Sequence, residues 1–225
     1  MMASGFPDPA RRAGQHGGGT AIALPRLVYL HGFRSSPRSF KAQLLAARLG
    51  ALGLAGCFAC PQLPASPAAA VDLVLRDIAP RRIDTLVGSS LGGYYATWVA
   101  ERSGCRAVLL NPAIFPARDL ATHTGVQRMY HSDGVFVFEP RYLDELAQLE
   151  VAAPTRLQRY LLIAARGDEL LDWREMVAKY RGAPKILLDG SDHGLSDFAT
   201  LVDRVLAFAG LGGGAIDSDP PAEQT

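Results

Sequence analysis

Two adjacent serines stand between an apolar run and a helix-like run, and glycines flank them. The segment Gly88-Ser89-Ser90-Leu91-Gly92 follows the pattern G-x-S-x-G, with Ser90 in the central position. A strand before this pattern and a helix after it form the context of a nucleophile elbow, a tight turn that exposes a reactive serine. Glycines are required because such a turn leaves no room for Cβ atoms. We therefore predict that Ser90 is a nucleophile and that the Ser89 side chain turns away. The alternatives are a plain glycine–serine turn and an anion-binding loop.

A serine hydroxyl is a weak nucleophile at neutral pH and needs a general base. Asp168 and His193 lie farther along the chain, each just past an apolar run, with one helix-like run between them. We predict that His193 takes the Ser90 proton and later returns it to the leaving group, while Asp168 orients the imidazole. Such a set of residues performs acyl transfer through a covalent intermediate.

Other acids and histidines compete for these roles. Glu169 lies beside Asp168, whereas Asp172 is typical of a helix N-cap and Asp192 of a loop turn. The remaining histidines lie in the N-terminal segment, after the first strand and in a central insertion: His16, His31, His123 and His131. They do not have the clustered spacing of metal ligands, so we predict no metal site and no cofactor.

Stabilisation of the charged intermediate requires two backbone N–H groups, which form an oxyanion hole. The residue after the nucleophile supplies one of them, here Leu91, and a loop with a His-Gly motif supplies the other. That loop is His31-Gly32-Phe33, directly after the first strand, so we predict the Phe33 amide as the second donor. We expect His31 to shape this loop and to contact substrate without transferring protons.

Strand-like and helix-like runs alternate along the chain. The apolar strand patterns cover residues 26–32, 56–63, 82–89, 106–113, 159–169 and 183–193. The helix patterns cover residues 37–53, 67–81, 91–104, 172–182 and 195–210. Uniformly apolar strands that alternate with helices predict a mainly parallel sheet with helices on both faces. Functional residues of such sheets gather at the carboxyl ends of the strands, which is where the candidate residues fall.

Residues 112–156 break this alternation, and we predict that they form a small cap over the carboxyl end of the sheet, with a helix at 140–149. An ordinary excursion without contact to substrate is the alternative. We expect Tyr94, Phe136 and Phe138 to contact substrate, although the cap aromatics, Tyr142 included, are equally compatible with a core. Residues 1–25 and 212–225 are predicted to be flexible, and residues 26–211 to form one domain.

Composition excludes several function classes. The chain has 225 residues, 48% of them hydrophobic, and a net charge of +1, which does not favour a nucleic-acid surface. No apolar stretch approaches the roughly 18 residues needed to span a bilayer. The cysteines, Cys57, Cys60 and Cys105, do not make a disulfide framework, so we expect a reducing, cytoplasmic location. Cys57 and Cys60 have the CxxC spacing of a redox pair, but we favour the alternative that they are buried apolar thiols.

Six segments occur together: LVYLHGFRSSPRSFKAQLL, PQLP, VGSSLGGYYATWVA, VLLNPA, RGDELLDWREMVAKY and GSDHGL. This combination resembles the small bacterial YqiA-like esterases of the α/β-hydrolase superfamily, over residues 26–211. The resemblance implies an α/β-hydrolase fold and, by position, a triad of Ser90, Asp168 and His193. Departures at both termini, and at Asp192 and Gly194, make the substrate preference less transferable.

The resemblance further implies carboxylesterase activity on short acyl esters, with a small-molecule ester or thioester as the binding partner. Two alternatives stay open. The same triad can serve an acyl-CoA thioesterase or acyltransferase, and a hydrolase fold can also act as a non-catalytic binding module. The natural substrate, the acyl chain length and the oligomeric state are not defined at this level.

Overall fold

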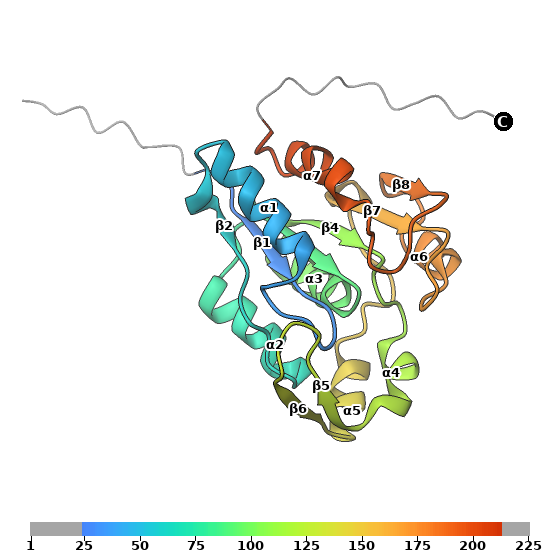
Figure 1. Ribbon diagram of the computed structural model, residues 1–225. Helices are drawn as coiled ribbons and strands as arrows, with labels where there is room; N and C mark the ends of the chain where they lie inside the picture. Colours follow the sequence, from blue (N-terminus) through green and yellow to red (C-terminus); the bar gives the residue numbers. More distant parts are fainter. Residues whose placement is uncertain (1–23, 213–225) are drawn as a thin grey trace, which may run out of the picture.

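Six strands form one sheet in the computed structural model, which describes residues 24–212 (Figure 1). They are β1 (Leu27–Leu30), β2 (Phe58–Ala59), β3 (Thr85–Ser89), β4 (Arg106–Leu110), β7 (Tyr160–Ala165) and β8 (Lys185–Leu188). Their order is β2-β1-β3-β4-β7-β8, and every neighbouring pair is parallel. The predicted parallel sheet is thereby confirmed. The two terminal segments predicted to be flexible lie almost wholly outside the described residues.

Burial on both faces explains why the strands are continuously apolar. All residues of β1 and β7 are buried. Successive side chains of a strand point to opposite faces, so Leu27 and Tyr29 join the core on one side, whereas Val28 and Leu30 join the core on the other.

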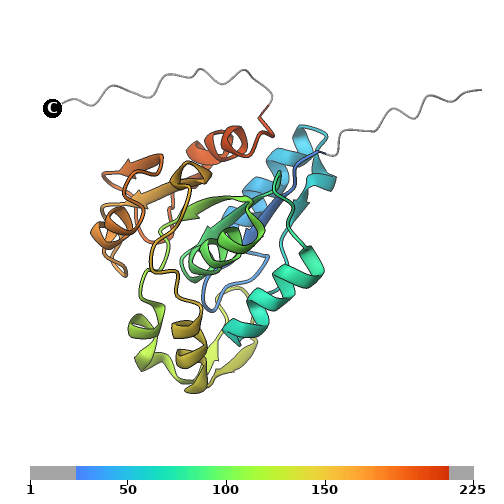
Figure 2. The same cartoon turned by 180° about the vertical axis from the view of Figure 1, so that it is seen from behind.

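Helices cover the two faces of the sheet. α1 (Phe40–Ala51) and α7 (Val202–Phe208) pack on one face, in front in Figure 1. α2 (Pro67–Leu73), α3 (Leu91–Ser103) and α6 (Trp173–Lys179) pack on the other face, which Figure 2 shows. The chain adds β2 on one side of β1 and β3 on the other, so the strand order reverses direction between β1 and β3. Ligands of open α/β sheets bind at the carboxyl ends of strands at such a point.

The element ends follow the local sequence, although the observed elements are shorter than predicted. Ser66 caps α2 by accepting a hydrogen bond from the Ala69 amide at 3.1 Å. The predicted helix 67–81 changes into a π-helical turn at Val74–Ile78. The predicted strand 56–63 contracts to the two residues of β2, because Pro61 cannot donate a hydrogen bond to a neighbouring strand.

Residues 112–156 hold two helices and two strands between β4 and β7, besides a 3₁₀ turn at Ala121–His123. They are α4 (Pro116–Asp119), the antiparallel pair β5 (Gly125–Arg128) and β6 (Val135–Phe138), and α5 (Arg141–Gln148), which gather at one end of the sheet in Figure 1. The predicted helix is present as α5. The hairpin was not expected, because β5 is a short strand without an apolar run and lies half exposed.

Hydrogen bonds join this insertion to the rest of the chain. The Tyr130 amide donates to the Arg34 carbonyl at 2.8 Å, and Arg34 Nε donates to the Arg128 carbonyl at 2.7 Å. On α5, the Glu145 carboxylate accepts from Ser66 Oγ at 2.6 Å. The insertion therefore lies against the loop that follows β1. Within residues 24–212, no helix has the length and apolar character that crossing a membrane requires.

Candidate active site

Ser90 is the single residue between β3 and α3, and its backbone is strained. Its φ and ψ are 54° and −120°, a region that residues with a Cβ rarely adopt. The Ser90 amide donates to the Leu110 carbonyl at 2.9 Å, and the Ser90 carbonyl accepts from the Gly93 and Ala113 amides at 2.9 and 3.0 Å. These hydrogen bonds hold the turn in the geometry predicted for a nucleophile elbow.

The glycines around Ser90 are required by close backbone contacts. A Cβ atom on Gly88 would lie 2.3 Å from the Gly92 carbonyl oxygen, and a Cβ on Gly92 would lie 2.0 Å from the Leu30 carbonyl oxygen. Gly93 is equally restricted, because its Cβ would lie 2.7 Å from the Cβ of Pro112. The turn can therefore pack beneath β1 and β4 only with glycine at these positions.

The loop after β1 passes directly beside Ser90. A Cβ on Gly32 would lie 3.2 Å from Ser90 Cβ, so the backbone that carries the Phe33 amide is next to the serine. Leu91 opens α3, and its amide lacks an acceptor within the helix, as first-turn amides do. The two amides predicted for the oxyanion hole thus belong to segments that meet at Ser90.

Asp168 and His193 form a hydrogen-bonded pair. Nδ1 of His193 lies 2.9 and 3.0 Å from the two carboxylate oxygens of Asp168, whose side chain is fully buried. The same carboxylate accepts from the amides of Leu170 and Leu171, both at 2.9 Å. An ionised Asp168 requires the proton on Nδ1, which leaves Nε2 as the acceptor that a general base needs. His193 and Ser90 line one cavity of about 370 Å³.

The competing acids have other partners. Asp172 caps α6 by accepting from the Arg174 amide at 2.9 Å, and Asp192 accepts from the Ser196 amide at 2.9 Å. That bond from Ser196 keeps the pKa of Asp192 below its usual value. Glu169 accepts from the backbone amide of His193 at 3.0 Å. It therefore holds the main chain at the histidine, while Asp168 holds the ring.

Asn111 is a site residue that sequence reasoning missed. It is fully buried at the end of β4, with a φ of 42°. Its Nδ2 donates to the carbonyls of Asp192 and His193 at 3.0 and 3.1 Å, and its Oδ1 accepts from the Ala165 amide at 2.8 Å. Asn111 therefore connects the histidine loop to the end of β7, three residues before Asp168. The available signal was a polar residue directly after an apolar strand run.

Lys41, the second residue of α1, was also missed. Only 7% of Lys41 is exposed, and Nζ donates to the carbonyl of Gly194, the residue after His193. Burial lowers the pKa of Lys41 to about 8, although Asp192 and Asp168 oppose this shift. Its position within an amphipathic helix pattern offered no signal of a contact with a loop more than 150 residues away.

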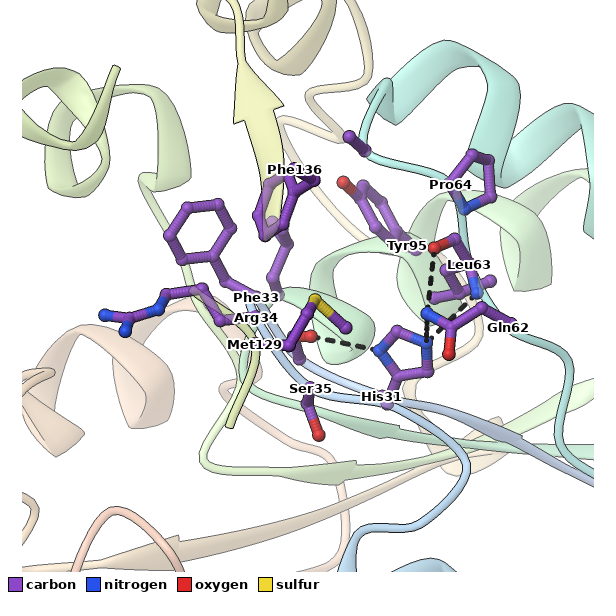
Figure 3. Close-up of a pocket in the computed structure, with 13 residues that line it drawn as sticks. His31, Phe33, Arg34, Ser35, Gln62, Leu63, Pro64, Tyr95, Met129 and Phe136 are labelled. Carbon is purple, nitrogen blue, oxygen red and sulfur yellow. Dashed lines mark hydrogen bonds between the residues drawn. The ribbon is translucent and has the colours of Figure 1, made fainter. Parts of the chain in front are cut away.

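His31 shapes its loop, as predicted. Its Nε2 accepts from the Leu63 amide at 3.0 Å, so Nδ1 carries the proton and donates to the Gly32 carbonyl at 3.1 Å (Figure 3). Burial lowers the pKa of His31, which favours this neutral form. Both ring nitrogens are occupied, so His31 is not placed for proton transfer.

A second cavity, of about 120 Å³, lies on the other side of the same loop (Figure 3). Leu63, Leu91, Tyr95, Met129 and Phe136 give it a mainly apolar wall. Residues 32–35 border both cavities. His31 and Phe136, expected to contact substrate, line this smaller cavity.

Tyr94 and Phe138, also expected to contact substrate, line neither of the two cavities at the elbow. The Tyr94 hydroxyl donates to the Leu146 carbonyl at 2.6 Å, so its ring binds α5 to α3. Phe138 is 1% exposed and packs edge-on against Phe33, with ring centroids 5.1 Å apart. Both aromatics therefore pack the insertion of residues 112–156 against the core.

Among residues 24–212, no group of three His, Cys, Asp or Glu side chains could hold a metal ion. Cys57 and Cys60 are free thiols rather than a disulfide. Burial raises the pKa of Cys60 to about 12, so this thiol is not a ready nucleophile.

A parallel sheet with an elbow after β3, an acid after β7 and a histidine after β8 defines the α/β-hydrolase fold. Solved structures share this fold. Est1E from Butyrivibrio proteoclasticus, determined with ferulic acid bound, aligns with a TM-score of 0.63 at 14% identity, over 85% of this chain and 90% of its own. The mouse alpha/beta hydrolase domain-containing protein 10 aligns with a TM-score of 0.62 at 16% identity, over 82% and 90%. Carboxylesterase CesB from Bacillus subtilis aligns with a TM-score of 0.52 at 18% identity, over 87% and 86%.

The chain belongs to the Uncharacterised protein family (UPF0227), which it matches over residues 26–210. This match confirms the resemblance to YqiA-like proteins that the six sequence segments indicated.

Proposed function

We propose that this protein is a serine hydrolase that cleaves short-chain carboxylic esters through an acyl-enzyme. The observation that carries the proposal is the pairing of His193 Nδ1 with buried Asp168, in the same cavity as the strained elbow serine. A strained backbone at this serine costs free energy and does not stabilise the fold. The same conformation exposes the serine hydroxyl as a nucleophile. The esterases among the structural neighbours support the same reaction class.

The reaction follows from the roles of these groups. Nε2 of His193 removes the proton as Ser90 Oγ attacks the ester carbonyl carbon, and Asp168 stabilises the imidazolium that forms. The amides of Leu91 and Phe33 donate to the developing oxyanion, and each such donor is worth roughly 3 kcal/mol. The carbon–oxygen bond then breaks, and His193 gives its proton to the departing alcohol. Water, activated by the same histidine, releases the acid and restores Ser90.

The smaller cavity supports a short acyl chain. An apolar cavity of about 150 Å³ holds a benzene molecule, and the cavity beside Leu91 and Phe33 measures about 120 Å³. This space accommodates roughly four carbon atoms.

Burst kinetics with para-nitrophenyl butyrate test the proposal. We expect one equivalent of nitrophenolate in a fast phase, followed by slower turnover, because nitrophenolate is a good leaving group and deacylation of Ser90 is then the slower step. Ser90→Ala should abolish both phases while circular dichroism remains unchanged. Ser89→Ala is the matched control, which removes the neighbouring hydroxyl and should keep the burst. Full activity in Ser90→Ala would exclude this mechanism.

A further inference from the structure

The N-terminus of α1 opens into the larger cavity, which Ser39, Phe40 and Lys41 line together with Ser90 and His193. Ser39 occupies the N-cap position but makes no capping hydrogen bond, and the first turn contains no acidic residue. The first amides of a helix have no acceptor within the helix, and the helix dipole makes this end positive. The end of α1 that faces the cavity is therefore electropositive and not compensated by its own sequence.

Lys41 adds a buried cation at the same place. Its ammonium group donates to the Gly194 carbonyl, which accounts for one of three N–H donors. Within the described part of the chain, no carboxylate lies within 4.0 Å of Nζ. Asp192 and Asp168 act on this ammonium group only from beyond salt-bridge distance. Buried charges are usually paired directly, so the ammonium group has room for an anionic partner from outside the chain.

Ser39 provides an independent observation. Its residue is 6% exposed and lines the cavity, yet in residues 24–212 its hydroxyl oxygen has no hydrogen-bond partner. The Tyr29 hydroxyl approaches Ser39 without reaching hydrogen-bond geometry. A buried hydroxyl without a partner costs free energy, and a bound ligand with an acceptor oxygen removes that cost.

Arg34 adds one more positive charge to the cavity wall, which His123 and His131 also line. Asp119 adds a negative charge, and its carboxylate accepts from Arg118 Nε at 2.8 Å, although Arg118 also pairs with Glu175. The end of the cavity formed by Lys41, Ser39 and the N-terminus of α1 therefore favours a negatively charged group.

We propose that the substrate carries an anionic group, a carboxylate or a phosphate, which binds Lys41 Nζ, Ser39 Oγ and the N-terminus of α1. This inference rests on the proposed ester hydrolysis and specifies its substrate class. The group belongs to the alcohol part of the ester. His193 must protonate the leaving oxygen, so the alcohol part lies beside His193, and Lys41 is bound to the residue that follows His193.

The test compares three butyrate esters that differ only in one para substituent of the phenol: a carboxylate, its methyl ester and a phosphate. For wild type and Lys41→Met, kcat/KM is measured for each ester, and the ratio of anionic to neutral ester is compared. This double ratio removes differences in leaving-group reactivity. We expect Lys41→Met to lower the ratio by about 10-fold or more, since a hydrogen bond to a charged group is lost. Ser39→Ala should lower it by a smaller factor, and it leaves the helix intact because Ser39 makes no cap bond.

Lys185→Met is the charge control, since Lys185 is exposed on β8, and the ratio should not change. A lower ratio for the carboxylate alone, or for the phosphate alone, identifies which anion is accepted. Equal losses for charged and neutral esters in Lys41→Met would overturn the proposal and leave Lys41 as a support of the histidine loop. That outcome would leave the esterase proposal intact, because the neutral ester would still be cleaved by wild type.

A binding experiment decides the question even if no ester is cleaved. Calorimetric titration with para-hydroxybenzoate should show that Ser90→Ala binds this anion. The double variant Ser90→Ala/Lys41→Met should bind it about 10-fold or more weakly. Equal affinity in the two proteins, or no binding to either, would overturn the anion site.

Discussion

At the scale of single residues, Asn111 connects parts of the site that are far apart in the sequence. It bonds to the main chain on both sides of the acid–histidine pair: to Ala165 at the end of β7, and to Asp192 and His193. The two donors and one acceptor of its amide group match two carbonyls and one N–H, an arrangement that no other side chain of similar size provides. Asn111 is therefore a positioning residue for His193.

Asn111→Ala should lower kcat by about 10- to 100-fold with little change in KM, because His193 loses its position while the cavity keeps its shape. The free energy of unfolding should fall by about 2–4 kcal/mol, since buried carbonyls are left without donors. The measurements are steady-state kinetics on para-nitrophenyl butyrate and urea denaturation. Tyr160→Phe is the control, because it removes a partly buried hydrogen bond to Glu101 at the opposite end of β7. If both variants lost only stability, Asn111 would have no role in positioning.

Sequence reasoning predicted that Ser90, Asp168 and His193 lie at one edge of the sheet, because each follows an apolar strand within a short loop and parallel strands bring their carboxyl ends together. It could not locate Lys41 or Asn111, which act through contacts with a loop that is distant in sequence. It also assigned Tyr94 and Phe138 to substrate contact. An aromatic residue near a site has the same sequence signal whether it faces a cavity or packs in the core. Here Tyr94 bonds to α5 and Phe138 packs against Phe33, and neither lines the two cavities at the elbow.

At the scale of elements, the close packing of the start of α3 against β1 fixes the position of the turn that carries Ser90. Gly92→Ala would put a methyl group 2.0 Å from the Leu30 carbonyl oxygen, a backbone atom that cannot move aside easily. We expect a loss of at least about 3 kcal/mol in the free energy of unfolding, with loss of activity. Gly50→Ala is the matched control, because a Cβ at Gly50 in α1 meets no atom within 4 Å. That variant should gain about 0.5–1 kcal/mol. Similar stability of the two variants would contradict this account of the turn.

The alternation of strands and helices was predictable because buried parallel strands are uniformly apolar. The insertion was less predictable. The β5–β6 hairpin carries exposed apolar side chains, Val126, Val135 and Val137, so its strands lack the inward-outward contrast that reveals a half-buried strand. Element lengths were overestimated wherever a proline, a π-helical turn or a 3₁₀ turn ended the regular hydrogen bonding.

At the scale of the whole molecule, the buried carboxylate of Asp84 connects segments at the amino ends of the strands, which is the edge of the sheet opposite the site. Burial alone would raise the pKa of Asp84, but hydrogen bonds from Arg81 and Arg26 outweigh this effect and hold it well below its usual value. A folded-state pKa below the unfolded value stabilises the fold above about pH 4, and this contribution is lost as pH falls further. Asp84→Asn should cost about 2 kcal/mol at pH 7. The free energy of unfolding of Asp84→Asn should also depend less on pH in the acid range than that of wild type. Urea denaturation at several pH values measures this difference. If the free energies of unfolding of wild type and Asp84→Asn changed in parallel with pH, this role for Asp84 would be ruled out.

The segment from Gly32 to Ser35 is a wall that the two cavities share. If the acyl chain occupies one cavity and the alcohol part the other, neither half of the ester is selected alone. A bulkier acyl group pushes on the backbone that also borders the alcohol part, so the preference for one half depends on the other. The protein would then select particular combinations of acid and alcohol. The effects of the two halves on kcat/KM, expressed as free energies, would not be additive.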